Sequence, residues 1–104
     1  MARFDVYPNP VKADRDSFPY LLEVQSDLLH RFAERVCVPL AKPGAFPGMT
    51  DRFNPLITVS RSSLRLHPLG IAVFLVQELR QPTTHARTHA LAIETAMDML
   101  FRGY

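Results

Sequence analysis

Apolar and polar residues alternate along several short segments of the chain, a pattern typical of β-strands with one buried face. In the first segment, Phe4, Val6 and the flanking polar residues follow this period of two before Pro8 ends it. Pro39 is expected at a sheet edge or a bulge, because proline cannot donate to a ladder. The apolar run from Ile71 predicts a central strand buried on both faces. The predicted strands are 3–7, 20–25, 35–40, 56–59, 63–67 and 71–76.

The pattern changes to a helical period after Pro82. Thr84 or Thr88 is expected to cap the helix by accepting a bond from a free N–H of the first turn. Gly103 is expected to end it in the left-handed conformation. The apolar stripe recurs at steps of three and four residues, at Ala86, Ala90, Ile93, Met97 and Leu100.

Short strands followed by one helix predict a mainly β fold, a small barrel or sandwich of about five to seven antiparallel strands with a C-terminal helix. The chain has 104 residues, which suits one domain spanning 1–104. A single cysteine excludes an internal disulfide framework. The start of the chain has no apolar signal region and the longest apolar run is too short for a bilayer, so we expect a cytoplasmic protein.

Candidate chemistry is sparse. His85 and His89 are four residues apart, so on one helix face they could share a metal, but two solvated histidines are the more common explanation. Asp27 and His30 are interpreted as a turn cap and a surface side chain. Cys37 could be a redox site, although a buried cysteine is commoner. We therefore predict no metal, no cofactor and no catalytic set.

The charge is also mild. Net charge is +2, too small to argue for nucleic-acid binding by itself. Arg52, Arg61 and Arg65 form a modest basic set that could bind RNA, but a solvated face is favoured. No phosphate loop or nucleophile elbow occurs. We expect a binding protein, not an enzyme, with no sequence-specific contact to nucleic acid.

Two apolar features are candidate contact surfaces. Leu28 and Leu29 follow a polar turn, and two adjacent leucines on an irregular segment do not easily face one core, although packing of both beneath the barrel fits the pattern equally well. The chain also ends with Phe101 and Tyr104 around a glycine, whereas chain ends are usually polar. Met97, Leu100 and Phe101 leave apolar area that a second copy could cover, so they are the predicted dimer interface.

In order and spacing, four short pieces of this chain resemble the CcdB family, the toxins of plasmid-type toxin–antitoxin pairs. The pieces are 24–29 (VQSDLL), 36–40 (VCVPL), 54–57 (NPLI) and 99–104 (MLFRGY), and the similarity extends from Phe4 to the end. The resemblance implies an SH3-like barrel that forms a homodimer. It also implies a DNA gyrase inhibitor that binds the gyrase A protein of this topoisomerase and traps cleaved DNA, and neutralisation by a CcdA-like antitoxin. The implied gyrase-binding residues are Leu28, Leu29, Asp98, Phe101, Arg102, Gly103 and Tyr104.

The chain departs from the family at two of these positions. Arg102 stands where the family usually has Trp, and Asp98 stands where it usually has Asn. The family's Trp is suited to stacking on gyrase arginines, so Arg102 would meet like charge. Two unit charges about 7 Å apart repel by roughly 0.6 to 2.4 kcal/mol in surroundings between water and a protein surface.

Two alternatives to gyrase poisoning follow. The related Kid and MazF toxins are ribonucleases on the same architecture, and here only Arg61, Arg65 and His67 could act on phosphate. The protein could also be a non-toxic relative that keeps the fold and binds only the antitoxin.

Overall fold

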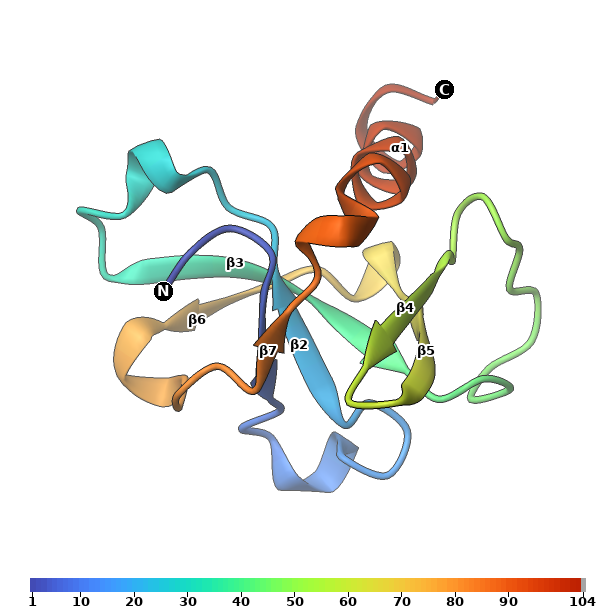
Figure 1. The fold of residues 1–104 in the computed structure, drawn as a ribbon, viewed down its shortest axis with the longest axis horizontal. Helices are drawn as coiled ribbons and strands as arrows, with labels where there is room; N and C mark the ends of the chain where they lie inside the picture. Colours follow the sequence, from blue (N-terminus) through green and yellow to red (C-terminus); the bar gives the residue numbers. More distant parts are fainter. Residues whose placement is uncertain (104) are drawn as a thin grey trace.

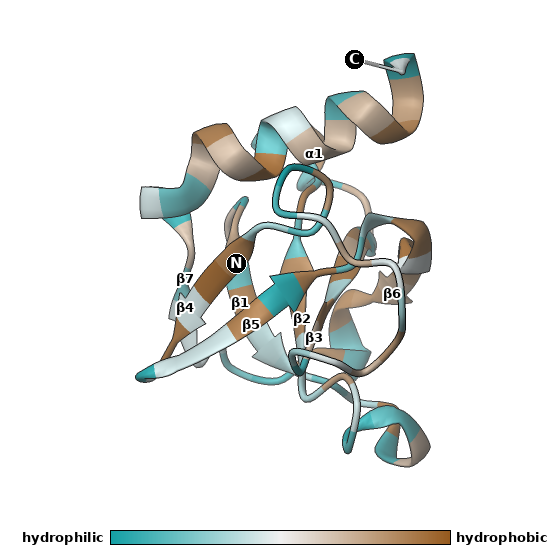
Figure 2. Cartoon of the chain, turned by 90° about the vertical axis from the view of Figure 1, so that its right-hand side faces the viewer, coloured by the Kyte–Doolittle hydropathy of each residue, from teal (hydrophilic) through white to brown (hydrophobic). Residues whose placement is uncertain are grey.

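The computed structural model describes residues 1–103 as one antiparallel sheet and one helix. The sheet wraps into a nearly closed barrel, and the helix α1 crosses one end of it as a separate layer (Figures 1 and 2). This confirms the mainly β barrel with a C-terminal helix. The elements are β1 (Asp5–Pro8), β2 (Tyr20–Glu23), β3 (Glu34–Ala41), β4 (Leu56–Val59), β5 (Ser62–Leu66), β6 (Ala72–Leu75), β7 (Thr84–His85) and α1 (Ala90–Arg102).

Strand β3 organises the sheet. The strand order is β4-β5-β3-β2-β1-β7, and β6 also pairs with β3. One edge of β3 therefore pairs with β2, from Tyr20 opposite Leu40 to Glu23 opposite Cys37, and its other edge is shared by β5 and β6. The register fixes which side chains of β3 face the core.

Pro39 lies inside the central strand β3, not at an edge of the sheet. A proline is tolerated there because β5 and β6 share one edge of β3 and leave a gap between them. It falls between the residues that pair with β6 and those that pair with β5. The carbonyl of His67, which faces this gap, accepts from the amide of Gly70 at 3.0 Å and so needs no donor from Pro39. Gly70 is required for close approach, because a Cβ there would lie 2.7 Å from the Pro39 ring.

The predicted central strand at 71–76 is wrong in its position. Strand β6 pairs only with β3, and its side chains are mostly exposed, with Val73 59% and Leu75 40% accessible. A continuous apolar run usually marks burial on both faces. Here the apolar run forms β6, a strand at the edge of the sheet whose apolar side chains Val73 and Leu75 are exposed.

The helix starts six residues later than predicted from Thr84. Thr84 and His85 pair with Val6 and Asp5 as β7, a 3-10 turn spans Arg87–His89, and α1 begins at Ala90. His89 is the N-cap residue, without a side-chain cap bond, so neither threonine caps α1. Tertiary pairing with β1 overrides the helical pattern here.

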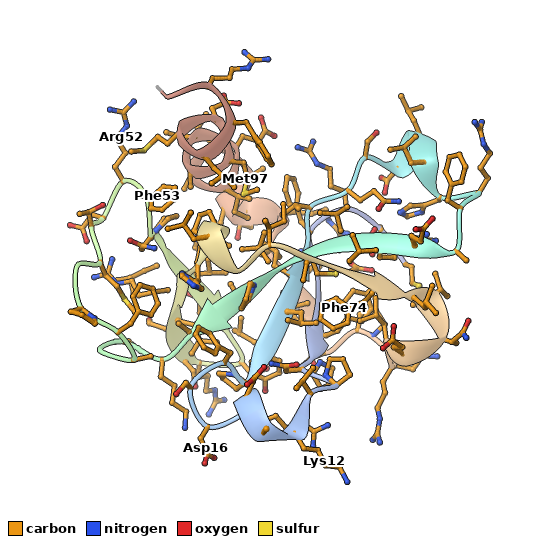
Figure 3. The ribbon with its side chains drawn as sticks, turned by 180° about the vertical axis from the view of Figure 1, so that it is seen from behind. Lys12, Asp16, Arg52, Phe53, Phe74 and Met97 are labelled. Atoms are coloured by element: carbon orange, nitrogen blue, oxygen red, sulfur yellow. The ribbon has the colours of Figure 1, made fainter. Side chains whose placement is uncertain are left out.

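The end of the helix is as predicted. Gly103 has φ +84°, and its amide donates to the carbonyls of Asp98 and Met99, both at 3.2 Å. Ile93 and Ala96 are buried, and Met97 lies on the underside of α1, facing the barrel (Figure 3).

Two groups of buried residues occupy the two faces of the sheet. The larger core lies inside the barrel and under α1; the smaller group contains Tyr7, Leu21, Cys37 and Leu79, with Phe74 packed against it. The larger core contains Phe4, Val6, Leu22, Val38, Leu40, Ile57, Val59, Leu64, Leu66, Ala86, Ile93 and Ala96. No helix within residues 1–103 combines the length and the apolar run needed to cross a bilayer.

Candidate partner-binding surface

The first predicted contact segment is a tight turn between β2 and β3. Ser26 opens the 3-10 turn Asp27–Leu29, and its hydroxyl accepts from the amide of Leu28 at 3.2 Å. Leu28 is 87% exposed and Leu29 44% exposed. The turn therefore displays both leucines, and Leu28 is almost free of the protein surface.

Side chains that the sequence analysis did not single out hold this turn in place. The Gln25 amide nitrogen donates to the carbonyls of Glu34, at 3.0 Å, and Leu29, at 3.4 Å, and its oxygen accepts from the amide of Val36. Arg35 donates to the carbonyls of residues 30, 32 and 34. No local signal marks Gln25 or Arg35, because their partners are main-chain carbonyls whose positions depend on the fold.

A buried carboxylate lies under the turn. Glu23 is fully buried; its Oε1 accepts from the Tyr7 hydroxyl at 3.0 Å, and its Oε2 lies 2.8 Å from Nε2 of His30. The same His30 nitrogen lies 3.1 Å from Asp27. Burial and the nearby Glu23 carboxylate raise the pKa of Tyr7 far above its usual range, so the phenol stays a neutral donor. Asp27 and His30 are therefore a structural pair, not only a cap and a surface residue.

The second predicted contact segment is the end of α1. Phe101 is 69% exposed, and Arg102, the last helical residue, and Asp98, one turn before it, are both exposed. Gly103 is exposed, and Tyr104 lies outside the described residues. Of the predicted dimer residues, Met97 and Leu100 are half-buried.

One groove brings the two segments together. It has a volume of about 260 Å³ and is lined on one side by Leu29 and on the other by Met97 and Phe101. The rest of its apolar lining is formed by Phe4, Val24, Val36, Ile71 and Ile93. The polar lining is formed by Gln25, Ser26 and the ion pair of Arg3 and Glu94 at 3.7 Å. Residues more than seventy positions apart in sequence thus share one apolar surface.

The other candidates do not form a site. His85 and His89 do not share a helix face: His85 is in β7 and accepts from the amide of Arg87, while His89 accepts from the amide of Thr58, each at 3.3 Å. Cys37 is fully buried, and burial raises the pKa of its thiol to about 12, so the thiol is inert.

Two of the three possible ribonuclease residues, Arg65 and His67, make contacts with other parts of the protein. Arg65 donates to Asp51 at 2.8 Å and to the carbonyl of Asn54. His67 packs against the rings of Phe18 and Phe46, with centroids 5.5 and 4.4 Å away, and burial lowers its pKa. Arg61 is exposed at the turn between β4 and β5.

The fold and this surface define a small barrel protein with an apolar contact face. The CcdB protein family model matches residues 3–103, so the chain belongs to the CcdB family of toxins. No curated protein sequence matches the chain.

Solved structures with a similar fold are described as endoribonucleases. An endoribonuclease in complex with its cognate antitoxin from Mycobacterial species superimposes with a TM-score of 0.77 at 17% identity, over 97% of this chain and 94% of that one. An endoribonuclease from Mycobacterial species superimposes with a TM-score of 0.70 at 16% identity, over 97% and 90% of the two chains. At this identity, the likeness is one of fold.

Proposed function

We propose that this protein is the toxin of a toxin–antitoxin pair and that it inhibits DNA gyrase by binding the gyrase A protein, without catalysis of its own. Membership of the CcdB family supports the class. One observation carries the finer proposal: Leu29 and Phe101 line the same groove, and Leu28 stands exposed beside it. These residues come from the two segments that the family resemblance assigns to gyrase.

The exposed apolar side chains of this surface can act as anchors for a partner. Burying a leucine or phenylalanine side chain stabilises by roughly 1.5 to 3 kcal/mol. A few such anchors in a dry centre account for most of the affinity of typical interfaces. The partner must therefore offer an apolar cavity that accepts the turn and the helix end together.

A homodimer would enlarge this surface. Val73 and Leu75 of β6 are exposed and do not line the groove, so they leave apolar area that a second copy can cover. Light scattering at micromolar concentration is expected to give about twice the 11.8 kDa chain mass. A monomer at that concentration would contradict this part of the proposal.

The antitoxin is proposed as the second partner. A structural neighbour is in complex with its cognate antitoxin. An apolar groove with a charged pair at its rim suits an amphipathic segment that becomes ordered on binding. A small gene adjacent to this one, encoding a DNA-binding protein with a flexible tail, would identify the antitoxin.

An endoribonuclease activity is the second candidate because the neighbours of this fold carry that name. The contacts of Arg65 and His67 do not favour it, since Arg65 is paired with Asp51 and His67 packs against the rings of Phe18 and Phe46. Incubation of the purified protein with RNA alone separates the two functions. Cleavage lost in Arg65→Ala would replace the gyrase proposal.

A pair of matched variants tests the gyrase proposal. Leu28 and Leu91 are both exposed leucines, 87% and 81% accessible, but only Leu28 is adjacent in sequence to a residue that lines the groove, Leu29. Leu28→Ala is expected to weaken binding to a gyrase A fragment by about tenfold or more, whereas Leu91→Ala leaves it unchanged. Calorimetric titration and a gyrase cleavage assay measure both. Equal effects of the two variants would contradict the proposed surface.

The third possibility is a relative that binds only its antitoxin. Arg102 is the residue that raises it, because a cation replaces the aromatic ring of the family at the end of α1. Absence of binding to any gyrase A fragment, together with tight binding of the antitoxin, would establish this alternative.

A further inference from the structure

A cationic pocket lies at the end of the barrel away from α1. It has a volume of about 300 Å³ and is lined by Arg15, from the loop between β1 and β2, and by Arg80, from the segment between β6 and β7. Tyr20, the first residue of β2, and Thr83 also line it. Figures 1 and 2 show the β1–β2 loop at this end of the barrel. The pocket shares no lining residue with the groove that is assigned to gyrase.

The two guanidinium groups of this pocket are available to an anion. Within residues 1–103, neither group forms an ion pair with a carboxylate. Nε of Arg15 donates to the carbonyl of Asn9 at 2.6 Å, which fixes the side chain and leaves its terminal nitrogens for a ligand, and Arg80 is exposed. Glu78 also lines the pocket, and its Oε1 accepts from the amide of Leu75 at 2.7 Å. Two arginines against one glutamate leave the pocket with an excess of positive charge.

A second pocket adjoins the first one at Tyr20. Pro19 and Tyr20 line both pockets, so the two cavities meet at these residues. The second cavity has a volume of about 500 Å³, and its cation is Lys42, which is exposed just after the end of β3. The exposed Ser62 and Ser63, at the start of β5, add two hydroxyl groups. Together the two pockets form a basic surface with an aromatic side chain at its centre, here called the Tyr20 surface.

This combination of groups is typical of proteins that bind single-stranded nucleic acids. Such sites place cations along the path of the phosphate backbone and provide aromatic rings on which bases stack. Arginine and lysine contact phosphate oxygens, and serine and threonine hydroxyls add hydrogen bonds to them. A cavity of about 300 Å³ is at the lower end of the range for ligand pockets, so it suits one unpaired nucleotide but not a duplex.

An acidic peptide is the alternative anion, but the lining of the Tyr20 surface favours a nucleic acid. Peptide-binding grooves obtain specificity and much of their affinity from apolar pockets for side chains, such as the groove lined by Leu29, Met97 and Phe101. Within residues 1–103, the aliphatic side chain that lines the Tyr20 surface, apart from the prolines, is Leu64, which is buried. The surface thus offers charge, hydroxyl groups and a ring, with little apolar anchoring for a peptide.

We propose that the Tyr20 surface binds single-stranded nucleic acid without sequence specificity. Arg15 and Arg80 bind one phosphate group, the ring of Tyr20 stacks on a base, and Lys42 binds a further phosphate group of the same strand. Binding that relies on a few phosphate contacts and stacking needs only local positive charge, so it is compatible with the small net charge of +2. The proposal does not depend on the inhibition of gyrase.

Fluorescence anisotropy of labelled oligonucleotides tests the surface on the wild-type protein. Oligo(dT) and oligo(U) of about ten nucleotides should bind with Kd values of about 1 to 100 µM at low salt. With three cations involved, affinity should fall about tenfold or more between about 50 and about 200 mM salt. A duplex of the same length should bind at least about threefold more weakly, because its bases are not free to stack. Equal binding of the duplex, or absence of binding to both single strands, would overturn the proposal.

A comparison of the two single strands identifies the natural ligand. Similar affinities are expected, because phosphate groups and base faces are common to DNA and RNA. A preference for either oligonucleotide, with the same dependence on salt, would support the surface and assign it to DNA or to RNA.

Matched variants locate the site. Arg80→Ala and Arg31→Ala each remove one exposed arginine, but only Arg80 lines the Tyr20 surface. Arg80→Ala should weaken oligo(dT) binding about fivefold or more, whereas Arg31→Ala should change it less than about twofold. Tyr20→Phe keeps the ring and should bind like the wild type, while Tyr20→Leu should lose at least about fivefold. Equal effects of the two arginine variants would overturn the proposal even if Tyr20→Leu fails to fold.

Poly(Glu) of equal charge separates attraction to any polyanion from binding of a nucleic acid. It should bind at least about tenfold more weakly than oligo(dT) at the same salt concentration, because it offers no base to stack. Binding of poly(Glu) that equals that of oligo(dT) and is lost in Arg80→Ala would overturn the proposal in favour of an acidic peptide. A failure of gyrase binding would leave all of these measurements unaffected.

Discussion

The two ends of α1 carry the same kinds of residues but differ in their surroundings. Leu91 and Arg87 lie at or just before the start, and Phe101 and Arg102 lie at the end, all four exposed. The start is tied to β4 through the bond between the amide of Thr58 and His89. The end borders the groove opposite the Leu28–Leu29 turn.

This difference shows that exposure of an apolar side chain does not by itself indicate a binding site. Single surface leucines are common in folded proteins. What distinguishes the end of α1 is a second rigid apolar element across a groove, so that one partner can bury both. Substitutions at the two ends of α1, and of residues that pack beneath the groove, should distinguish a binding surface from ordinary surface exposure. The largest effect is expected at Glu23, which lies under the Leu28–Leu29 turn.

The largest effect is expected from removing the buried anchor of the turn. Glu23→Gln keeps the volume but leaves Arg35 without a compensating charge, so the free energy of unfolding should fall by about 3 to 5 kcal/mol. Urea denaturation measures it. Glu94→Gln, which removes an exposed ion pair near the same groove, is the control and should change stability by less than about 1 kcal/mol. Equal stability losses would show that the anchor is not the Glu23 cluster.

Deleting residues 102–104 should abolish function with little loss of stability. Among the described residues, the deletion removes only Arg102, the last residue of α1, and the Gly103 cap, which together cost about 1 kcal/mol or less. The melting temperature should therefore fall by only a few degrees, roughly 4 to 8 °C per kcal/mol for a domain of this size. Growth inhibition and gyrase binding should both disappear. Unfolding of the truncated protein would indicate that the tail holds the structure together instead.

Arg102→Trp should sharpen the comparison between the two ends. If the gyrase pocket carries the cations expected from the family resemblance, the substitution removes like-charge repulsion and adds a cation–π contact, so binding should tighten at least about tenfold. Arg87→Trp, at the other end of α1, should have no such effect. Calorimetric titration against a gyrase A fragment measures both.

The same substitution distinguishes two kinds of gyrase. A cognate gyrase with an acidic or aromatic lining would lose affinity for Arg102→Trp, while an ordinary gyrase would gain it. No change with either gyrase would exclude a direct contact at position 102 and would favour the relative that binds only its antitoxin.

The smallest effect concerns His67, next to a turn that packs against the helix. His67 precedes the 3-10 turn Pro68–Gly70, which contacts α1, and burial lowers its pKa below the usual value of 6.5. The unfolded chain therefore takes up the proton first, and stability should decline as the pH falls below about 6.5. Thermal melts should show a loss of a few degrees that is absent in His67→Phe. A melting temperature with the same pH dependence in both proteins would assign the effect to another group.

The sequence by itself determined the elements whose signals are local. The sequence pattern located β1, β2, β3 and β5 within one or two residues, and β4 at its observed bounds, because a strand with one buried face needs a period of two wherever it lies. Gly103 fixed the helix end, since a left-handed residue is needed there. The exposure of Leu28, Leu29 and Phe101 also agrees with the sequence, because two adjacent leucines on an irregular segment do not easily face one core.

Only the tertiary structure decided how these elements meet. An apolar run shows that a face can be buried but not whether anything covers it, and β6 at the sheet edge was therefore misjudged. Pairing of Thr84 and His85 with β1 replaced the first turns of the predicted helix and separated His85 from His89. The buried Glu23 cluster could not be predicted from the sequence, because a buried charge is tolerated only when groups from distant segments compensate it. Tyr7, His30 and Arg35 provide that compensation only after the barrel has closed.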